Sequence, residues 1–149
     1  MGTSIIEVAD LFTMLVSDYR LDSLYITSGS SGFNTYLEGW LLFAIGDFSV
    51  CNQDLAYSTT TQTFTETLTQ ENINILAQLM VKFWMQKLVQ DILQTNSAIQ
   101  DHDYKTFSAA ANLKEKQNMY NAKREELSQL LNDYAFENNT WSSWNLQIF

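Results

Sequence analysis

A chain of 149 residues, 46% of them hydrophobic and 13% aromatic, has enough apolar material to form one folded domain, so intrinsic disorder is not expected. Its net charge of −9 at pH 7 opposes binding to the phosphate backbone of nucleic acids, which relies on clustered Lys and Arg. The longest apolar run, residues 40–45, is too short to cross a bilayer, and no signal-peptide pattern is present, so we expect neither membrane insertion nor secretion.

The first third of the chain predicts two helices separated by a loop. Residues 5–19 repeat apolar side chains at helical spacing, and Ser4 with Glu7 matches a capping box at their start. The Ser- and Gly-rich residues 27–32 predict a flexible loop, and residues 34–45 predict the second helix. Gly39 lies inside this helix, where glycine is unfavourable, so we expect it to mark a close packing contact.

Between residues 47 and 67 the helical spacing of the apolar residues is lost. Seven threonines occur between residues 59 and 69, and β-branched residues of this kind favour extended structure. We predict a β-hairpin or an extended Thr-rich loop, with its turn near residues 52–53 or within residues 58–61. A lone hairpin is marginally stable in water, so this one should pack against the helices or against a partner.

Residues 68–100 form the longest apolar-rich stretch and contain neither Pro nor Gly. Thr69 fits an N-cap, and Leu68 and Ile73 are placed for a hydrophobic staple. Apolar residues lie on more than one face of the predicted helix. This width implies contacts beyond one flanking helix, and we expect another copy of the chain to supply some of them.

Residues 103–134 predict a second long helix, antiparallel to the first and joined to it near His102. The predicted fold is mainly α: a bundle of about four helices, two of them long and antiparallel, with a hairpin or extended loop between helices two and three. We assign residues 1–137 to one domain, with residues 47–67 as an insertion, and residues 138–149 to an aromatic C-terminal arm. Whether this arm packs back on the bundle or anchors another surface stays open. The candidate interface residues are Phe64, Trp141, Trp144, Ile148 and Phe149.

No residue pattern indicates catalysis, a cofactor or a metal ion. The one histidine, His102, lies between two aspartates, but adjacent residues cannot all point at one ion. The one cysteine, Cys51, excludes a disulfide within the chain, fits a reducing compartment and lacks a protease signature. We therefore predict no catalytic, cofactor-binding or metal-binding residues, and a protein that is not an enzyme.

Charge is spread unevenly along the chain. Residues 1–80 carry nine acidic residues against Arg20 alone, a net charge of −8, so residues 81–149 contribute only −1 of the total of −9. Acidity of this kind aids solubility, and it also suits a surface that repels DNA or binds a basic protein.

The order of these features resembles the head-to-tail connector, or neck adaptor, proteins of tailed bacteriophages. The resemblance is carried by YLEGWLLFAIGDF at residues 36–48, CNQDL at residues 51–55, FTETLTQENINILAQLMVKFW at residues 64–84, and the charged helix at residues 103–134. It spans roughly residues 5–137 as a pattern of helices around a Thr-rich loop, and the Trp-rich end at residues 141–149 has no counterpart in it.

The resemblance implies a structural virion protein that forms a ring, commonly of twelve copies, below the portal. Its partners would be copies of itself, the portal protein, the next tail or neck component, and genomic DNA that passes through the lumen without specific binding. No membrane would be involved. Its place would be the virion neck, after assembly in the cytoplasm of the bacterial host. The alternative hypothesis is an acidic protein-binding module, antitoxin-like or an anti-repressor, that blocks a basic partner.

Overall fold

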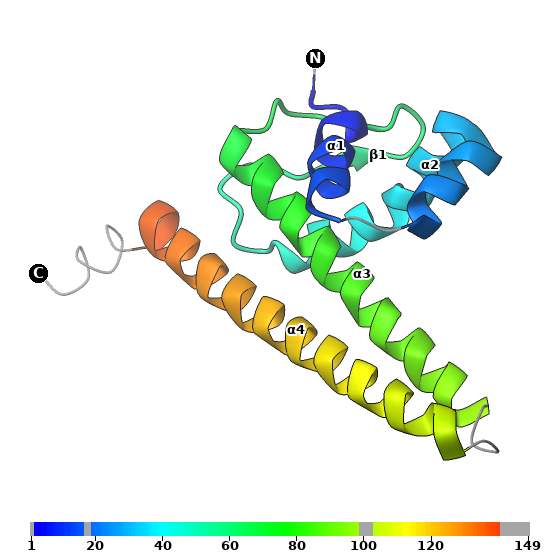
Figure 1. Cartoon of the computed structure of the whole chain (residues 1–149). Helices are drawn as coiled ribbons and strands as arrows, with labels where there is room; N and C mark the ends of the chain where they lie inside the picture. The colour runs from blue at the N-terminus through cyan, green and yellow to red at the C-terminus, as the bar shows by residue number, and fades with distance from the viewer. Residues whose placement is uncertain (1, 17–18, 99–102, 141–149) are drawn as a thin grey trace, which may run out of the picture.

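The computed structural model describes residues 2–16, 19–98 and 103–140, and shows helices arranged around one long central helix (Figure 1). In chain order the elements are α1 (Ile5–Leu15), α2 (Tyr19–Asp47), β1 (Tyr57–Ser58), β2 (Thr63–Phe64), α3 (Gln70–Ala98), α4 (Asp103–Ala135) and the π-helical turn η1 (Phe136–Thr140). The predicted fold class is confirmed: the described chain is mainly helical, with a two-stranded antiparallel sheet between the second and third helices.

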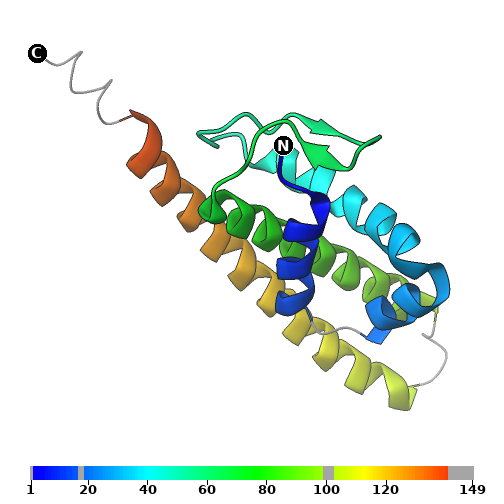
Figure 2. The same ribbon diagram turned by 90° about the horizontal axis from the view of Figure 1, so that it is seen from above.

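α3 and α4 form a long antiparallel pair that extends beyond the rest of the molecule (Figures 1 and 2). The register of the pair is set by two contacts: the Tyr134 hydroxyl donates to Asn72 Oδ1 at 2.8 Å, and Lys123 Nζ donates to Gln78 Oε1 at 3.4 Å. Since both acceptors lie in the first third of α3, the C-terminal half of α4 packs against the start of α3. The predicted turn at His102 lies outside the described residues.

The core lies around the N-terminal half of α3, which α1, α2 and α4 cover from different sides. Almost every residue of α3 from 72 to 81 is buried, including Ile75, Leu76 and Leu79, although these side chains point in different directions around the helix. Contacts beyond one flanking helix are therefore present, as the width of the apolar surface predicts. This half of α3 is covered within the chain, so its burial does not require a second copy.

α1 begins with the predicted capping box. The Ser4 hydroxyl accepts from the backbone N–H of Ile6 at 3.3 Å, and the Glu7 carboxylate accepts from the backbone N–H of Ser4 at 3.4 Å. The helix ends earlier than predicted, at Leu15, because Val16 adopts an extended conformation. Leu15, the last residue of the helix, is 55% exposed, whereas Val16 is buried.

The chain does not form the predicted loop at residues 27–32. α2 includes these residues and changes direction at Gly29, whose φ of 70° and ψ of −177° are non-helical (Figure 2). Within the helical turns on either side, the Thr27 and Thr35 hydroxyls donate to backbone carbonyls four residues earlier. Tyr25 and Phe33 pack edge to face across the kink, with ring centroids 5.5 Å apart. The sequence locates the break, but the helix resumes immediately after it.

The Thr-rich segment forms the predicted hairpin, with Tyr57 paired to Phe64 and residues 59–62 as its turn. The second of the two predicted turn positions is therefore close to the observed one. The hairpin packs against the N-terminal segment of the same chain: Phe64 N–H donates to the Thr3 carbonyl at 2.8 Å, and Ile5 N–H donates to the Gln62 carbonyl at 3.0 Å. These bonds supply the support that a two-stranded sheet needs.

α3 begins with the predicted N-cap, since the Thr69 hydroxyl accepts from the backbone N–H of Asn72 at 3.3 Å. Leu68 and Ile73 are both buried, as a hydrophobic staple requires. Within the described chain, no helix combines the length and apolar character needed to span a membrane.

Two of the glycines of α2, Gly29 and Gly39, offer a matched test of its backbone. Gly29→Ala should destabilise the chain by about 1–3 kcal/mol, because side chains rarely adopt that φ and ψ. Gly39→Ala should instead stabilise it by about 0.5–1 kcal/mol, since a Cβ there meets nothing within 4 Å. The prediction that Gly39 marks a close contact is therefore wrong. Urea unfolding of both variants checks the pair, and a stabilising Gly29→Ala would contradict the kinked backbone.

Candidate interaction surface

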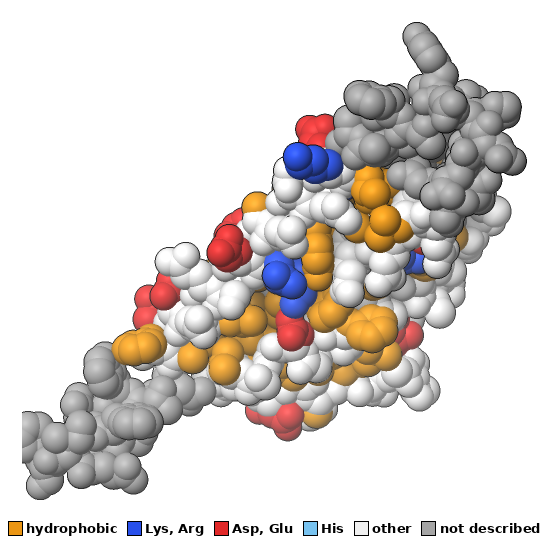
Figure 3. Space-filling view, turned by 90° about the horizontal axis from the view of Figure 1, so that it is seen from below, with side chains coloured by type: hydrophobic (Ala, Val, Ile, Leu, Met, Phe, Trp, Pro, Cys, Tyr) orange, Lys and Arg blue, Asp and Glu red, His pale blue; other side chains and the backbone are white. Residues whose placement is uncertain are grey.

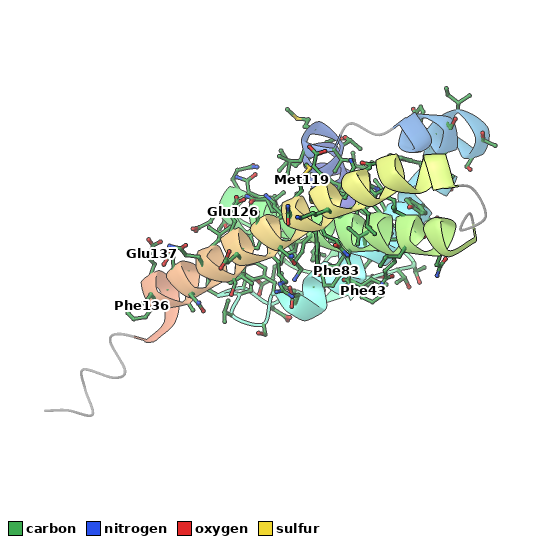
Figure 4. The ribbon with its side chains drawn as sticks, turned by 60° about the horizontal axis from the view of Figure 1, so that its bottom comes forward. Phe43, Phe83, Met119, Glu126, Phe136 and Glu137 are labelled. Atoms are coloured by element: carbon green, nitrogen blue, oxygen red, sulfur yellow. The ribbon has the colours of Figure 1, made fainter. Side chains whose placement is uncertain are left out.

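Four aromatic side chains form a continuous patch where α2 crosses α3. Tyr36, Trp40 and Phe43 follow one another at helical spacing on α2, beside the buried stripe of the same helix. Their ring centroids are 6.0 Å apart for Tyr36 and Trp40 and 6.3 Å for Trp40 and Phe43, and Phe43 lies 5.5 Å from Phe83 of α3. Figure 4 shows Phe43 and Phe83 side by side. We call these four residues the α2–α3 aromatic patch.

The patch is only partly covered. Phe43 is 61% exposed, and Tyr36, Trp40 and Phe83 are half-buried at the edge of the core. The indole N–H of Trp40 is buried and has no hydrogen-bond acceptor among the described residues. A large exposed aromatic residue seated on half-buried ones is typical of the anchors of protein–protein interfaces.

The charge beside the patch is neutralised within the chain. Lys82 forms an ion pair with Asp47 at the end of α2, and its ammonium group lies 4.6 Å from the centroid of the Phe83 ring. Only 14% of the Lys82 side chain is exposed, so its positive charge is shared between the carboxylate and the ring. The patch therefore presents apolar surface to a partner rather than an unpaired charge.

The lower face of the molecule carries apolar side chains gathered in its middle, among separate acidic and basic ones (Figure 3). Other large apolar residues are exposed singly. Phe136 is 60% exposed near the end of α4, far from Phe43 and Phe83 (Figure 4). Met14 on α1 and Ile26 on α2 are more than 80% exposed. Scattered exposures of this kind are ordinary in folded proteins, whereas the α2–α3 aromatic patch is continuous.

A buried polar junction joins the start of α3, the end of α4 and the loop after α2. The Tyr134 hydroxyl accepts from the backbone N–H of Asn52 at 3.0 Å and lies 2.8 Å from Asn72 Oδ1. The Asn72 side-chain amide donates to Gln53 Oε1 at 2.7 Å and to Asn52 Oδ1 at 3.1 Å. Burial raises the pKa of the Tyr134 hydroxyl, so it stays neutral. The junction holds the α3–α4 pair in register, and residues 52–53 serve it rather than a turn of the hairpin.

Cys51 lies at the edge of this junction, with its sulfur 3.9 Å from the Tyr134 hydroxyl. It is a half-buried free thiol. Among the described residues, His, Cys, Asp and Glu side chains do not gather in groups of three or more that could hold a metal ion.

The predicted interface residues fall into two groups. Phe64 is 1% exposed and packs in the core, so the prediction that it contacts a partner is wrong for the folded chain. The pairing of β2 with β1 and with the N-terminal segment turns this side chain inward. Trp141, Trp144, Ile148 and Phe149 lie outside the described residues.

The structure adds Phe43 and Phe83, which the sequence did not identify as interface residues. Phe43 lies within the apolar run at residues 40–45, where every side chain has the character of a core residue. The available signal was its position on the edge of the predicted buried stripe of α2. That signal cannot distinguish a covered edge from an uncovered one.

Comparison with protein-family models, with curated proteins and with solved structures gives no match to this chain. The sequence pattern and the geometry of the described residues therefore carry the functional argument.

Alanine substitutions at Phe64 and Phe43 distinguish a core position from a surface position. Phe64→Ala should destabilise the chain by about 3–5 kcal/mol, because it leaves a cavity beneath the hairpin. Phe43→Ala should cost less than about 1 kcal/mol, since most of that ring is already in water. Urea unfolding monitored by circular dichroism measures both values. Equal costs would show that the aromatic patch is part of the core.

The hydroxyl of Tyr57 ties the hairpin to α2 by donating to Glu38 Oε1 at 2.9 Å. Burial, the hydrogen bond to Glu38 and the negative charge of Glu38 all raise the pKa of the Tyr57 hydroxyl well above its usual value near 10. Because the folded state holds this proton more tightly than the unfolded state, the contribution to stability is complete below about pH 10 and is lost as the pH rises further.

Tyr57→Phe should therefore reduce the loss of stability in alkaline solution. The free energy of unfolding of the wild-type chain should fall more steeply above about pH 10 than that of the variant, which has no proton to lose at this position. Urea titrations between pH 8 and pH 11 measure both slopes. Parallel slopes would contradict a raised pKa for Tyr57.

Proposed function

We propose that this chain is a structural assembly protein of a tailed-bacteriophage virion, in which copies form a ring that joins the portal to the tail. The observation that carries the assembly role is the α2–α3 aromatic patch, in which the exposed ring of Phe43 packs against Phe83 of a neighbouring helix. Exposed aromatic surface of this kind is a feature of binding sites, because its transfer from water to a partner is favourable.

The bundle supports the same proposal. α3 and α4 form a long antiparallel pair, and the Thr-rich strands pack against the N-terminal segment and α2 (Figure 2). The placement of YLEGWLLFAIGDF on α2 and of NINILAQLMVKFW on α3 brings two segments of the sequence resemblance together at the patch. The assignment to the neck of the virion rests on that resemblance.

Acidic side chains suit a channel through which DNA moves. In the first half of the chain, Glu7, Asp10, Asp54, Glu66 and Glu71 are exposed. Carboxylates that face a lumen would repel the phosphate backbone and prevent DNA from sticking. A ring structure with these residues on its outer rim would exclude this part of the proposal.

The same acidic residues support a second candidate, a module that binds and blocks a basic protein. Electrostatic attraction would then steer the partner to the exposed carboxylates, and binding would weaken strongly with added salt. The ring proposal places the main contact at the apolar patch instead. Association through that patch should depend weakly on salt, which distinguishes the two candidates.

Analytical ultracentrifugation of the chain, with and without a phage portal protein, tests the ring. We expect co-sedimentation with the portal as a multimer, and we expect Phe43→Ser to weaken it at least tenfold while Met14→Ser does not. Both residues are exposed and apolar, but only Phe43 lies in the patch. If the chain does not bind the portal protein but binds basic proteins at low salt, the result favours the second candidate.

A further inference from the structure

We propose that residues 141–149 of one copy bind the α2–α3 aromatic patch of a neighbouring copy. The inference rests on the proposed function, since it needs copies that meet, and it adds which segment contacts which surface. The patch is an apolar surface on the described body, and the segment is an apolar piece of the same chain beyond it.

The composition of the segment matches that of the patch. Five of its nine residues are large and apolar, and none carries a charged side chain; the five are Trp141, Trp144, Leu146, Ile148 and Phe149. Tryptophan is enriched among the residues that dominate binding at interfaces, and aromatic rings pack favourably against one another. Because Lys82 is already paired with Asp47, the patch offers no unpaired charge that a neutral segment would leave buried.

The reach of the segment favours a neighbouring copy over its own. Tyr134 packs beside Asn72, and Phe83 lies about eleven residues further along α3, or roughly 17 Å. η1 continues α4 in the opposite direction, which adds about 8 Å between Tyr134 and Thr140. Nine extended residues span about 30 Å, so within one copy only the last one or two residues would reach the patch. Both tryptophans would fall short of it.

A peptide also suits the unpaired donor in the patch better than a purely hydrocarbon ligand does. The indole N–H of Trp40 is buried next to Phe43 without an acceptor among the described residues. A buried donor without an acceptor is costly, and a polypeptide laid along the patch brings a carbonyl with every residue. The exposed Phe43 ring lies 6.3 Å from the Trp40 ring, centroid to centroid, so a peptide that contacts Phe43 lies next to this indole.

Complementation between two full-length variants tests the contact. One variant carries Trp141→Ser and Trp144→Ser and keeps its patch, and the other carries Phe43→Ser and keeps its segment. Each alone should remain monomeric in analytical ultracentrifugation, and the mixture should form a one-to-one heterodimer that grows no further, because only one intact contact is available. The matched control, Met14→Ser, should associate as the wild-type chain does.

A photo-crosslinking amino acid at position 43 tests the same contact in the otherwise unchanged chain. In a mixture of isotope-labelled and unlabelled copies, we expect crosslinks from position 43 to residues 141–149 that join a labelled copy to an unlabelled one. Crosslinks only within one copy would overturn the inference in favour of a segment folded back on its own body. It would also be overturned by an absence of crosslinks to the segment, or by variants that stay monomeric when mixed.

The outcomes separate this inference from the proposed function. If the chain binds the portal and the segment variant binds it equally well, the inference fails and the ring stands. If the heterodimer forms but the chain never binds a portal, the contact stands and the neck assignment fails.

Discussion

The burial of the first half of α3 by three other helices is the constraint on which the rest of the structure depends. Apolar residues on more than one face of a helix are unfavourable in water, and α1, α2 and α4 each remove one part of this surface from solvent. The hairpin and the N-terminal segment close the same core through Phe64 and Thr3. Because these elements gather around the start of α3, the far end of the α3–α4 pair extends away from them (Figure 1).

This arrangement accounts for both the polar junction and the aromatic patch. Where α3, α4 and the loop after α2 converge, the Tyr134 hydroxyl accepts from the backbone N–H of Asn52, and the Asn72 side chain bonds to the side chains of Asn52 and Tyr134. Further along α3, α2 crosses it, and the aromatic stripe of α2 is only partly covered at the crossing. Phe43 is left at the outer edge of the crossing, against Phe83. One packing geometry thus produces a closed polar contact at one point and an open apolar one at another.

The structure changes how the apolar surface of α3 is interpreted as evidence for oligomerisation. An excess of apolar residues on α3 suggests oligomerisation when the helix is considered alone, yet the chain covers the first half of that helix itself. The remaining argument for assembly is smaller and more local, and it rests on the side chains that the bundle does not cover. Interface residues are therefore identified by what the fold leaves exposed, rather than by how apolar a segment is.

Local patterns determined the elements of this protein. The capping box at Ser4, the N-cap at Thr69 and the hairpin of the Thr-rich segment are set by neighbours in the sequence, through short-range hydrogen bonds and backbone preferences. The inward position of Phe64 and the exposure of Phe43 were decided by tertiary packing. Each depends on which distant segment lies alongside, and apolar residues on a covered face and an uncovered one look the same along the chain.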